Sequence, residues 1–332
     1  MVLVAMHDDA SPLATISNQS VPCGRFAPSP SGPLHFGSLV AALGSFMMAR
    51  SEGGRWLLRI EDIDTPRVVP GAADAILHTL EAFGLCWDGP VTYQSHRLPY
   101  YKDALSRLLA AGLAYPCSCS RQEVARTATK PLGTLVYPGT CRHGPLRLDQ
   151  LTAIRLRTDA RIICFHDLLQ GFYSQCLETA VGDFLIRRAD GLFTYQLAVV
   201  VDDAAQGITQ VVRGSDLLES TPRQIYLQHL LGLPTPGYHH LLVAVDRFGY
   251  KLSKQTQAEP VNYRQPAPSL LAALRFLGQN PPPELAATRL DEVWSWALAN
   301  WRPERIPALT TLGWTQTPRL ESAPATTVTK DF

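Results

Sequence analysis

One loop near the start of the chain combines residues that could bind a phosphate. Gly32 and Gly37 would let the backbone approach a ligand closely, and His35 between them could donate a hydrogen bond to a phosphate oxygen. An apolar pattern at helical spacing begins directly afterwards, at Leu39, so a helix N-terminus would face the bound anion. A turn that only connects a strand to a helix has the same composition, so both interpretations stay open at this point.

Two lysines far along the chain could act on the same ligand. Lys251 and Lys254 flank Leu252 and Ser253 in a polar segment, and compact ammonium groups on a loop are suited to neutralising charge on a triphosphate. A solvated pair of surface lysines is the ordinary alternative. This segment (251–255) is called the lysine loop below, and the loop that contains His35 (24–38) is called the His35 loop. A catalytic interpretation therefore requires a fold that brings the two loops together.

Three cysteines are spaced as ligands for a metal ion. Cys117 and Cys119 are separated by one residue and Cys141 follows, whereas the other four of the seven cysteines are scattered. Zinc takes four ligands in a tetrahedron, and His143 is the chemically usual candidate for the fourth. Three free buried thiols are the alternative. The odd number of cysteines argues against a disulfide framework.

The overall composition limits the class of protein. The chain has 332 residues and a mass of 36.5 kDa, enough for about two domains, and its 46% hydrophobic residues are ordinary for a globular protein. A net charge of +1 gives no global electrostatic reason to bind nucleic acid or membranes. Prolines and His35 interrupt the longest uncharged stretch, 26–49, so we expect no transmembrane helix. Residues 1–22 lack a signal-peptide pattern, which predicts a flexible extension and a cytoplasmic protein.

Strands and helices that alternate along the chain would position these residues. Segment 56–62 has the pattern of a buried strand that ends in acidic residues. Helix patterns follow over 72–83 and 98–111, closed by Gly84 and Gly112. This alternation predicts an α/β protein with an open parallel sheet of the Rossmann type, whose ligands lie beyond the carboxyl ends of the strands.

A basic segment interrupts the alternation. Residues 117–161 contain eight Lys or Arg against three Asp or Glu, a local charge of +5. Ser120 and Glu123 have the capping-box spacing of a short helix, and strands are predicted over 153–158 and 161–169. We expect an α+β subdomain inserted into the parallel-sheet domain, with a basic face that is either solvated or in contact with RNA phosphates.

The parallel-sheet domain is predicted to resume after the insert. A hairpin turn at 190–191 leads into the apolar run 197–203, which we predict as a central strand. Thr221 is the predicted N-cap of a helix that runs to Leu231, and two or three helical segments follow the lysine loop. The predicted division comprises a flexible extension (1–22), the two halves of the parallel-sheet domain (23–116 and 183–245), the insert (117–182), the lysine loop with a mainly helical region (246–320), and a flexible tail (321–332).

Taken together and in this order, the motifs resemble those of the class I aminoacyl-tRNA synthetases. PSPSGPLHFGS (28–38) and KLSKQ (251–255) are similar to the two signature sequences of that class, HIGH and KMSKS. The resemblance to the catalytic domains of glutamyl-tRNA synthetases covers roughly residues 24–260. It is carried by the segments GRFAPSPSGPLHFGS (24–38), RIEDID (59–64), FTYQLAVVVDD (193–203) and VVRGSDLLESTPRQIYL (211–227).

Departures of the two signatures from the class pattern matter for ATP binding. Ser38 replaces the second histidine of HIGH, a shorter donor that can still cap a helix and bind a phosphate. Leu252 replaces the methionine of KMSKS and Gln255 its last serine. No charge is lost at the lysine loop, so we expect the loop to keep its role in catalysis. Its flexibility and its binding of ATP are expected to differ.

The resemblance implies a site for glutamate and for ATP with Mg²⁺. Arginines would hold the glutamate carboxylates, Glu61 would pair with the α-ammonium group, and Tyr195 would hydrogen-bond the amino acid. The implied glutamate-binding residues are Arg25, Phe26, Ala27, Pro28, Ser29, Glu61, Tyr195 and Arg213. The implied ATP-binding residues are Pro28, His35, Gly37, Ser38, Lys251 and Lys254, of which His35 and Lys254 are catalytic. Without the resemblance, Glu61 would read as the cap of a strand and Arg213 as part of a surface ion pair.

The resemblance also implies one structural zinc ion per chain. Its ligands would be Cys117, Cys119, Tyr137 and Cys141, so that Tyr137 competes with His143 for the fourth position. Such an ion would tie down the insert rather than take part in catalysis.

Within the family, the chain resembles a short branch that glutamylates the queuosine base of tRNA(Asp). Fewer than 80 residues follow Gln255, where a glutamyl-tRNA synthetase carries a large helical anticodon-binding region, and the HFGSL and CSC…YPGTC patterns are similar to the short branch. This implies tRNA-independent activation of L-glutamate with ATP and its transfer to queuosine at the wobble position, by a monomer with no membrane partner. It also implies that the mainly helical region within 246–320 contacts the tRNA stem. The alternatives are a truncated glutamyl-tRNA synthetase that charges an acceptor end, a noncatalytic synthetase-like RNA-binding protein, and an unrelated nucleotidyltransferase.

Overall fold

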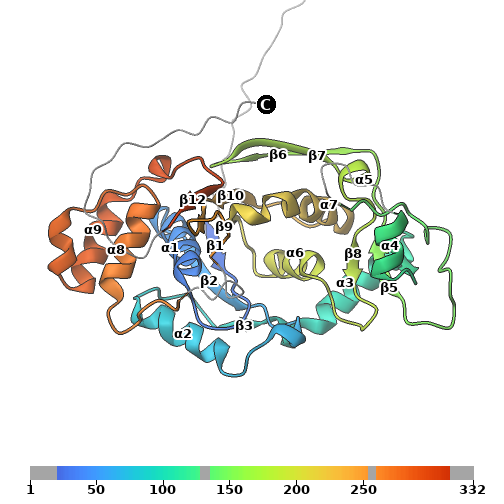
Figure 1. Cartoon of the computed structure of the whole chain (residues 1–332), viewed down its shortest axis with the longest axis horizontal. Coiled ribbons are helices and arrows are strands. Elements are labelled where there is room, and N and C mark those ends of the chain that lie inside the picture. Colours follow the sequence, from blue (N-terminus) through green and yellow to red (C-terminus); the bar gives the residue numbers. More distant parts are fainter. Residues whose placement is uncertain (1–20, 128–134, 253–258, 315–332) are drawn as a thin grey trace, which may run out of the picture.

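The computed structural model describes residues 21–127, 135–252 and 259–314. Figure 1 shows an elongated molecule with its parallel strands near the middle, orange and red helices at one end, and the green insert at the other. Residues 1–20 of the predicted extension, the predicted tail 321–332, and both Lys254 and Gln255 lie outside the described residues.

Two sets of parallel strands form the centre of the molecule. β1 pairs with β2 and β2 with β3, while β9 pairs with β10, all in parallel. The two sets adjoin, because the backbone N–H of Thr209 beside β9 donates to the carbonyl of Cys23 in β1 (2.9 Å). The strands are β1 (Cys23–Phe26), β2 (Arg55–Ile60), β3 (Thr92–Tyr93), β9 (Gln210–Gly214) and β10 (Gly237–Leu241). The predicted α/β class with a parallel sheet is confirmed.

Helices connect and cover these strands, as in βαβ units. They are α1 (Phe36–Ser51), α2 (Ala72–Ala82), α3 (Leu98–Ala110), α6 (Tyr195–Ala205) and α7 (Thr221–Leu231). α1 lies so close to β10 that a Cβ at Gly44 would be 2.5 Å from the Cδ1 of Leu241, so any larger residue there would force the Leu241 side chain to move. The helices predicted to end before a glycine are confirmed. A 3₁₀ helix (Ser215–Ser220) runs directly into α7, so the residue before α7 is Ser220, and Thr221 is the first residue of the helix rather than its N-cap.

Residues 197–203 belong to helix α6, so the prediction of a central strand was wrong. An uninterrupted apolar run rich in valine is typical of a buried strand, but periodicity alone does not separate it from a buried helix. α6 packs against both α3 and α7 as well as facing the sheet region, so consecutive residues such as Val199 and Val200 are all buried. The run ends in Asp202 and Asp203, which are also buried.

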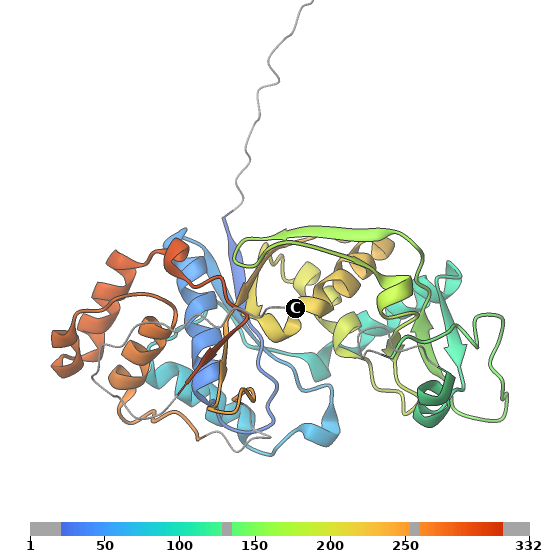
Figure 2. The ribbon, with the colours of Figure 1, turned by 45° about the horizontal axis from the view of Figure 1, so that its top comes forward.

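The segment between α3 and α6 forms a small antiparallel sheet and a long hairpin. The sheet has the order β4-β5-β8, and the hairpin consists of β6 and β7. These elements are β4 (Ala114–Cys117), α4 (Arg121–Thr127), β5 (Ala153–Leu156), β6 (Ile162–Asp167), β7 (Gly171–Cys176), α5 (Leu177–Ala180) and β8 (Leu185–Arg187). The hairpin reaches from the insert back to the central strands (Figures 1 and 2), where Asp167 of β6 pairs in parallel with Tyr238 of β10.

The predicted capping box starts α4. The backbone N–H of Ser120 donates to the carboxylate of Glu123 (2.7 Å), and the N–H of Glu123 donates to the hydroxyl of Ser120 (3.2 Å). The insert boundaries of 117 and 182 stay a prediction, because in the antiparallel sheet β4 starts before residue 117 and includes it, and β8 lies beyond residue 182.

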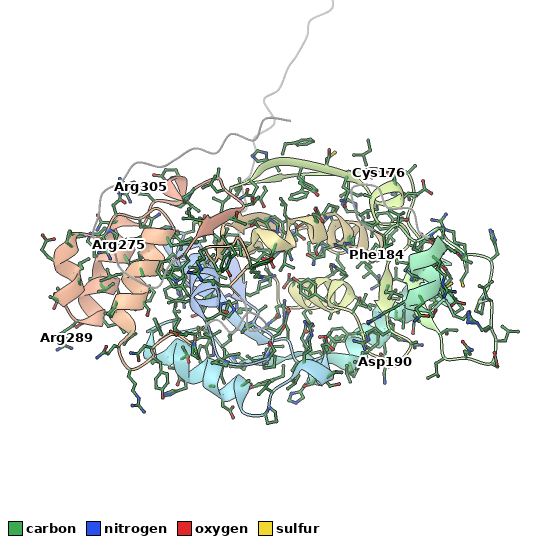
Figure 3. The ribbon with its side chains drawn as sticks, viewed as in Figure 1. Cys176, Phe184, Asp190, Arg275, Arg289 and Arg305 are labelled. Atoms are coloured by element: carbon green, nitrogen blue, oxygen red, sulfur yellow. The ribbon has the colours of Figure 1, made fainter. Side chains whose placement is uncertain are left out.

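The C-terminal part packs against α1. Its elements are α8 (Pro266–Phe276), α9 (Leu290–Asn300), β11 (Val243–Val245) and β12 (Thr311–Gly313), the last two paired in parallel. Trp314 stacks on Phe36 of α1 with ring centroids 3.5 Å apart. Figure 3 shows Arg275 and Arg305 at this helical end, across the molecule from Cys176 in the insert.

No helix among the described residues is both long enough and apolar enough to span a membrane.

Candidate active site

A cavity of about 610 Å³ lies at the carboxyl ends of β1, β9 and β10, where a parallel sheet binds its ligands. Its wall also includes the first turn of α1, the start of α6 and the segment after β11. The predicted site residues that line it are Arg25, Phe26, Ala27, Pro28, Ser29, His35, Gly37, Ser38, Tyr195, Arg213 and Lys251. A second cavity of about 380 Å³, around Arg55 and Asp88, contains none of the predicted site residues.

His35 holds the first turn of α1 in place. It is the N-cap of the helix, and its Nδ1 accepts a hydrogen bond from the backbone N–H of Ser38 (3.3 Å). A neutral imidazole with Nδ1 as acceptor carries its proton on Nε2, which lies 3.1 Å from the Ser38 hydroxyl. Gly32 in the preceding loop has φ 139°, a conformation that favours glycine. Ser38 therefore contacts His35 directly, although it is not the histidine of the class signature.

The lysine loop begins beside the His35 loop. The carbonyl oxygen of Leu252 would lie 3.6 Å from a Cβ at Gly37, and the ammonium group of Lys251 pairs with Asp216 (2.6 Å) at the same cavity. Two segments more than 200 residues apart in the sequence therefore meet at one site. The spatial premise of the sequence argument is confirmed for Lys251.

Among the residues that the structure describes, Arg213 of β9 has only neutral hydrogen-bond partners. Its Nε donates to Nε2 of His240 (3.0 Å), and its Nη2 donates to the hydroxyl of Thr221 (2.7 Å). Its Nη1 donates to the Tyr195 hydroxyl (3.2 Å) and to Oε1 of Gln224 (2.8 Å).

This environment contradicts a surface ion pair for Arg213. The residue is only 6% exposed, and none of the carboxylates in the described ranges forms an ion pair with it. A buried guanidinium whose charge is not neutralised by the protein is suited to receive a carboxylate, because the planar donor group can form two parallel hydrogen bonds.

Arg25 of β1, in contrast, is charge-compensated. Its Nε is 3.1 Å from Oδ1 of Asp203, and the same oxygen lies 2.8 Å from Nη1 of Arg59. Burial opposes ionisation of Asp203, but the charges of Arg25 and Arg59 hold the pKa of its carboxyl below the ordinary value. Arg25 therefore lines the cavity, and its guanidinium is held in place by a buried network of charges with Asp203 and Arg59.

Glu61 lies behind the cavity wall. Its carboxylate is 3.3 Å from Nη2 of Arg59, and its backbone N–H donates to the carbonyl of Pro28 (3.0 Å). Burial raises the pKa of Glu61, against the opposing effect of Arg59 and Arg25. The structure does not bring this carboxylate into the lining with Arg213 and Tyr195, so its pairing with an ammonium group stays a prediction.

Three partners of Arg213 were missed from the sequence: His240, Thr221 and Gln224. Successive side chains of a strand point to opposite faces, so one of His239 and His240 must face the side on which Arg213 lies. The pair of histidines could therefore have suggested that one of them belongs to the site. No pattern in the sequence pointed to the other two, because they come from α7, which reaches β9 only through tertiary packing.

The predicted metal-binding cysteines come together. The Sγ atoms of Cys117, Cys119 and Cys141 lie within 4.8 Å of one another. A tetrahedral zinc ion with Zn–S bonds of about 2.3 Å places its sulfur ligands about 3.8 Å apart, so this spacing fits one ion. The Tyr137 hydroxyl lies 3.4 Å from Sγ of Cys117 and 3.5 Å from Sγ of Cys119, whereas His143 is not part of the group.

The surroundings of the cluster favour a thiolate at Cys141, whereas burial raises the pKa of the Cys119 thiol to about 11. The guanidinium carbon of Arg155 lies 3.7 Å from the ring centroid of Tyr137, and its Nε donates to Sγ of Cys117 (3.3 Å). Burial opposes ionisation of Cys141, but hydrogen bonds from Tyr137 and backbone N–H groups lower the pKa of its thiol to about 7. Thiolates are the form that binds zinc, so the donor set fits the ion.

Comparison with known proteins identifies the family. The family model for the catalytic domain of class I tRNA synthetases (E and Q) matches residues 23–277. A glutamyl-Q tRNA(Asp) synthetase from Aromatoleum aromaticum is 56% identical over 302 residues, covering 91% of this chain and 93% of the relative. The corresponding protein of Dechloromonas aromatica is 59% identical over 286 residues, covering 86% of this chain and 95% of the relative.

Solved structures agree with the fold. The crystal structure of a glutamate tRNA ligase from Elizabethkingia meningosepticum, in complex with its amino acid, superimposes with a TM-score of 0.72 at 26% identity, over 87% of this chain and 66% of that chain. A glutamate-tRNA synthetase from Elizabethkingia anophelis gives a TM-score of 0.74 at 25% identity, over 90% of this chain and 68% of that chain. The chain therefore belongs to the glutamyl-Q tRNA(Asp) synthetases, within the class I synthetase family whose catalytic domain it carries.

Proposed function

We propose that the protein activates L-glutamate with ATP, without tRNA, and transfers the glutamyl group to the queuosine base at the wobble position of tRNA(Asp). The observation that carries the proposal is Arg213, a buried guanidinium with neutral partners in the cavity that His35 and Lys251 also line. The names of the relatives supply the tRNA acceptor.

Glutamate presents two carboxylates and one ammonium group to such a site. Arg213 and Arg25 are proposed to hold the carboxylates, with Tyr195 beside Arg213 as a further hydrogen-bonding group. Glu61 is proposed to balance the α-ammonium group from behind the wall at Pro28. A glutamine side chain would leave the charge of the receiving guanidinium unpaired, so the acid is favoured over the amide.

Adenylation requires no protein nucleophile. An oxygen of the α-carboxylate attacks the α-phosphorus of Mg–ATP, the bond to the bridging oxygen breaks, and pyrophosphate leaves with that oxygen as glutamyl-adenylate forms. The protein contributes positioning and charge stabilisation. The residues proposed to contact the nucleotide and its phosphates are Pro28, His35, Gly37, Ser38, Lys251 and Lys254.

Transfer then joins glutamate to the modified base. A hydroxyl oxygen of queuosine attacks the acyl carbon of the adenylate, the bond from that carbon to the phosphate oxygen breaks, and an ester forms. AMP leaves with that oxygen, and the hydroxyl proton is released to solvent. The insert is proposed to contact the tRNA phosphates, and the exposed Arg121 and Arg126 on α4 are suited to this. Arg142 is occupied in an ion pair with Asp183 and contributes less.

The choice of acceptor is tested by aminoacylation with labelled glutamate. We expect label on tRNA(Asp) that contains queuosine, and none on tRNA(Asp) without queuosine or on tRNA(Glu). Mild alkali should release the label as expected for an ester. Label on the acceptor end of tRNA(Glu) would contradict the proposal and support a truncated glutamyl-tRNA synthetase.

The cysteine cluster is proposed to hold one structural zinc ion per chain, with Tyr137 rather than His143 as the fourth ligand. When bound, zinc would link the end of β4 to the segment that contains Cys141. Protein purified without chelators is expected to contain about one zinc per chain by elemental analysis.

Variants at His143 and at Cys141, one of the three sulfur ligands, test the assignment of the fourth ligand. His143→Ala should retain the metal, whereas Cys141→Ser should lose most of it and lower the melting temperature. Less than about half an equivalent of zinc in the wild-type protein would contradict the assignment. Equal metal loss in His143→Ala and Cys141→Ser would show that His143 is the fourth ligand.

A further inference from the structure

Behind Arg213 lies a buried histidine that is itself held by a carboxylate. His240 of β10 and Asp167 at the end of β6 are both fully buried. Nδ1 of His240 is 2.6 Å from Oδ2 of Asp167, and Nε2 on the other side of the ring is 3.0 Å from Nε of Arg213. Carboxylate, imidazole and guanidinium therefore form one continuous chain that ends at the cavity.

The geometry specifies the protonation state of this chain. Nε of an arginine is only a donor, so Nε2 of His240 must accept, and its neutral ring carries the proton on Nδ1. That proton is donated to Asp167, which is only an acceptor when ionised. Burial and the charge of Arg213 lower the pKa of His240, against the effect of Asp167, in agreement with a neutral ring.

Asp167 is fixed by the backbone. Its Oδ1 accepts from the N–H groups of Leu169 (3.0 Å), Gln170 (2.9 Å) and His240 (3.1 Å), which leaves Oδ2 for the imidazole. The carboxylate therefore cannot rotate without breaking three hydrogen bonds, and it selects one tautomer of His240.

We propose that Asp167 and His240 act as a positioning relay that fixes the plane of the Arg213 guanidinium for the substrate carboxylate. The proposal rests on the function proposed above for Arg213. Imidazole supplies an acceptor without a negative charge, so it orients Arg213 and leaves its charge available to glutamate. A carboxylate in the position of the ring would orient the guanidinium equally well but would neutralise it.

The relay also connects the insert to the amino-acid pocket. Asp167 closes β6 of the long hairpin, which Figures 1 and 2 show running from the insert to the central strands. Gln170 in the turn that follows donates to the carbonyls of His240 (2.8 Å) and Leu309 (3.1 Å). The end of the hairpin is thus anchored beside the strand that carries His240.

Two substitutions of His240 separate its two hydrogen bonds. In His240→Gln, the side chain is long enough to place an amide oxygen near the position of Nε2 and accept from Arg213. In His240→Asn, the shorter amide replaces Nδ1 and cannot reach Arg213. We expect His240→Asn to raise KM for glutamate about tenfold or more in ATP–pyrophosphate exchange, and His240→Gln to restore it to within about threefold of wild type.

Asp167→Asn tests the tautomer. The three backbone donors hold the amide oxygen, so the amide NH₂ group must face Nδ1 of His240 and force its proton onto Nε2. The Nε2–H of His240 and the Nε–H of Arg213 would then be two donors that face each other, and the hydrogen bond between them would be lost. We expect KM for glutamate to rise about tenfold, with KM for ATP and kcat changed far less, because binding of the carboxylate is what is lost.

His239→Asn is the matched control. His239 is the neighbouring residue of the same strand and is 2% exposed. Within the described part of the chain, its Nδ1 has no hydrogen-bond partner and it forms no hydrogen bond with Arg213. A rise in KM for glutamate in His239→Asn equal to that in His240→Asn would overturn the relay, since strand disruption would explain both. Melting temperatures and KM for ATP report on folding in all four variants.

Arg213→Met separates failure of the relay from failure of the proposed function. If Arg213→Met raises KM for glutamate while His240→Asn and Asp167→Asn leave it within about twofold of wild type, the relay is wrong and the role of Arg213 stands. If Arg213→Met itself leaves KM for glutamate unchanged, the proposed glutamate site is wrong.

Discussion

Replacement of Arg213 by methionine is expected to lower kcat/KM for glutamate in ATP–pyrophosphate exchange by about a hundredfold or more. Methionine keeps much of the length of the side chain but removes the charge and all of its donors. The partners on His240, Thr221 and Gln224 are neutral, so no buried carboxylate of the protein is left unpaired by the change. The loss should therefore appear in binding of glutamate rather than in folding.

Separate titrations of glutamate and ATP, with a melting temperature for each protein, check this expectation. Arg275→Met is the control, because Arg275 is exposed on α8 at the far end of the molecule (Figure 3). The control should match wild type in both titrations. If KM for glutamate in Arg213→Met stays within about twofold of the wild-type value, the assignment of the substrate carboxylate to this residue is wrong.

Lys254→Ala is expected to reduce the rate of ATP–pyrophosphate exchange by about two to three orders of magnitude, with little change in glutamate binding. Lys254 lies outside the described residues, and its role comes from the KLSKQ motif. The motif begins at the cavity, where Lys251 lines the wall and Leu252 approaches Gly37. An ammonium group that acts on charge developing at the phosphates contributes mainly in the transition state, so kcat should fall.

The measurement compares the exchange rate at saturating substrates with glutamate affinity from equilibrium binding. Lys102→Ala is the matched control, because Lys102 is exposed on α3 and does not line the cavity. Near-normal exchange in Lys254→Ala would contradict the role given to the lysine loop.

The sequence predicted well those elements whose signals are local. Glycines after 72–83 and 98–111 mark helix ends because they adopt left-handed conformations without strain. The Ser120 and Glu123 capping box needs only residues three apart. The prediction for the apolar run 197–203 was wrong for the opposite reason. Whether this run forms a strand or a helix depends on the elements packed around it, and these come from other parts of the chain.

The candidate site shows the same difference between features with a local signal and features that depend on tertiary contacts. The motifs and their order were sufficient to identify the family and to nominate His35, Lys251 and Arg213, because such residue types in that order are rarely combined otherwise. The sequence did not distinguish Arg213, with neutral partners, from Arg25, which is paired with Asp203. The charge that an arginine presents to a ligand depends on its neighbours in space.

The order of residues along this chain was thus enough to reveal which chemical groups are available, the local structures that their neighbours favour, and the family to which they belong. The position of Glu61 behind the cavity wall, and of His240 and Asp167 behind Arg213, became visible only in the folded molecule. Burial and electrostatic compensation arise from contacts between segments far apart in the chain, and no local pattern records such contacts.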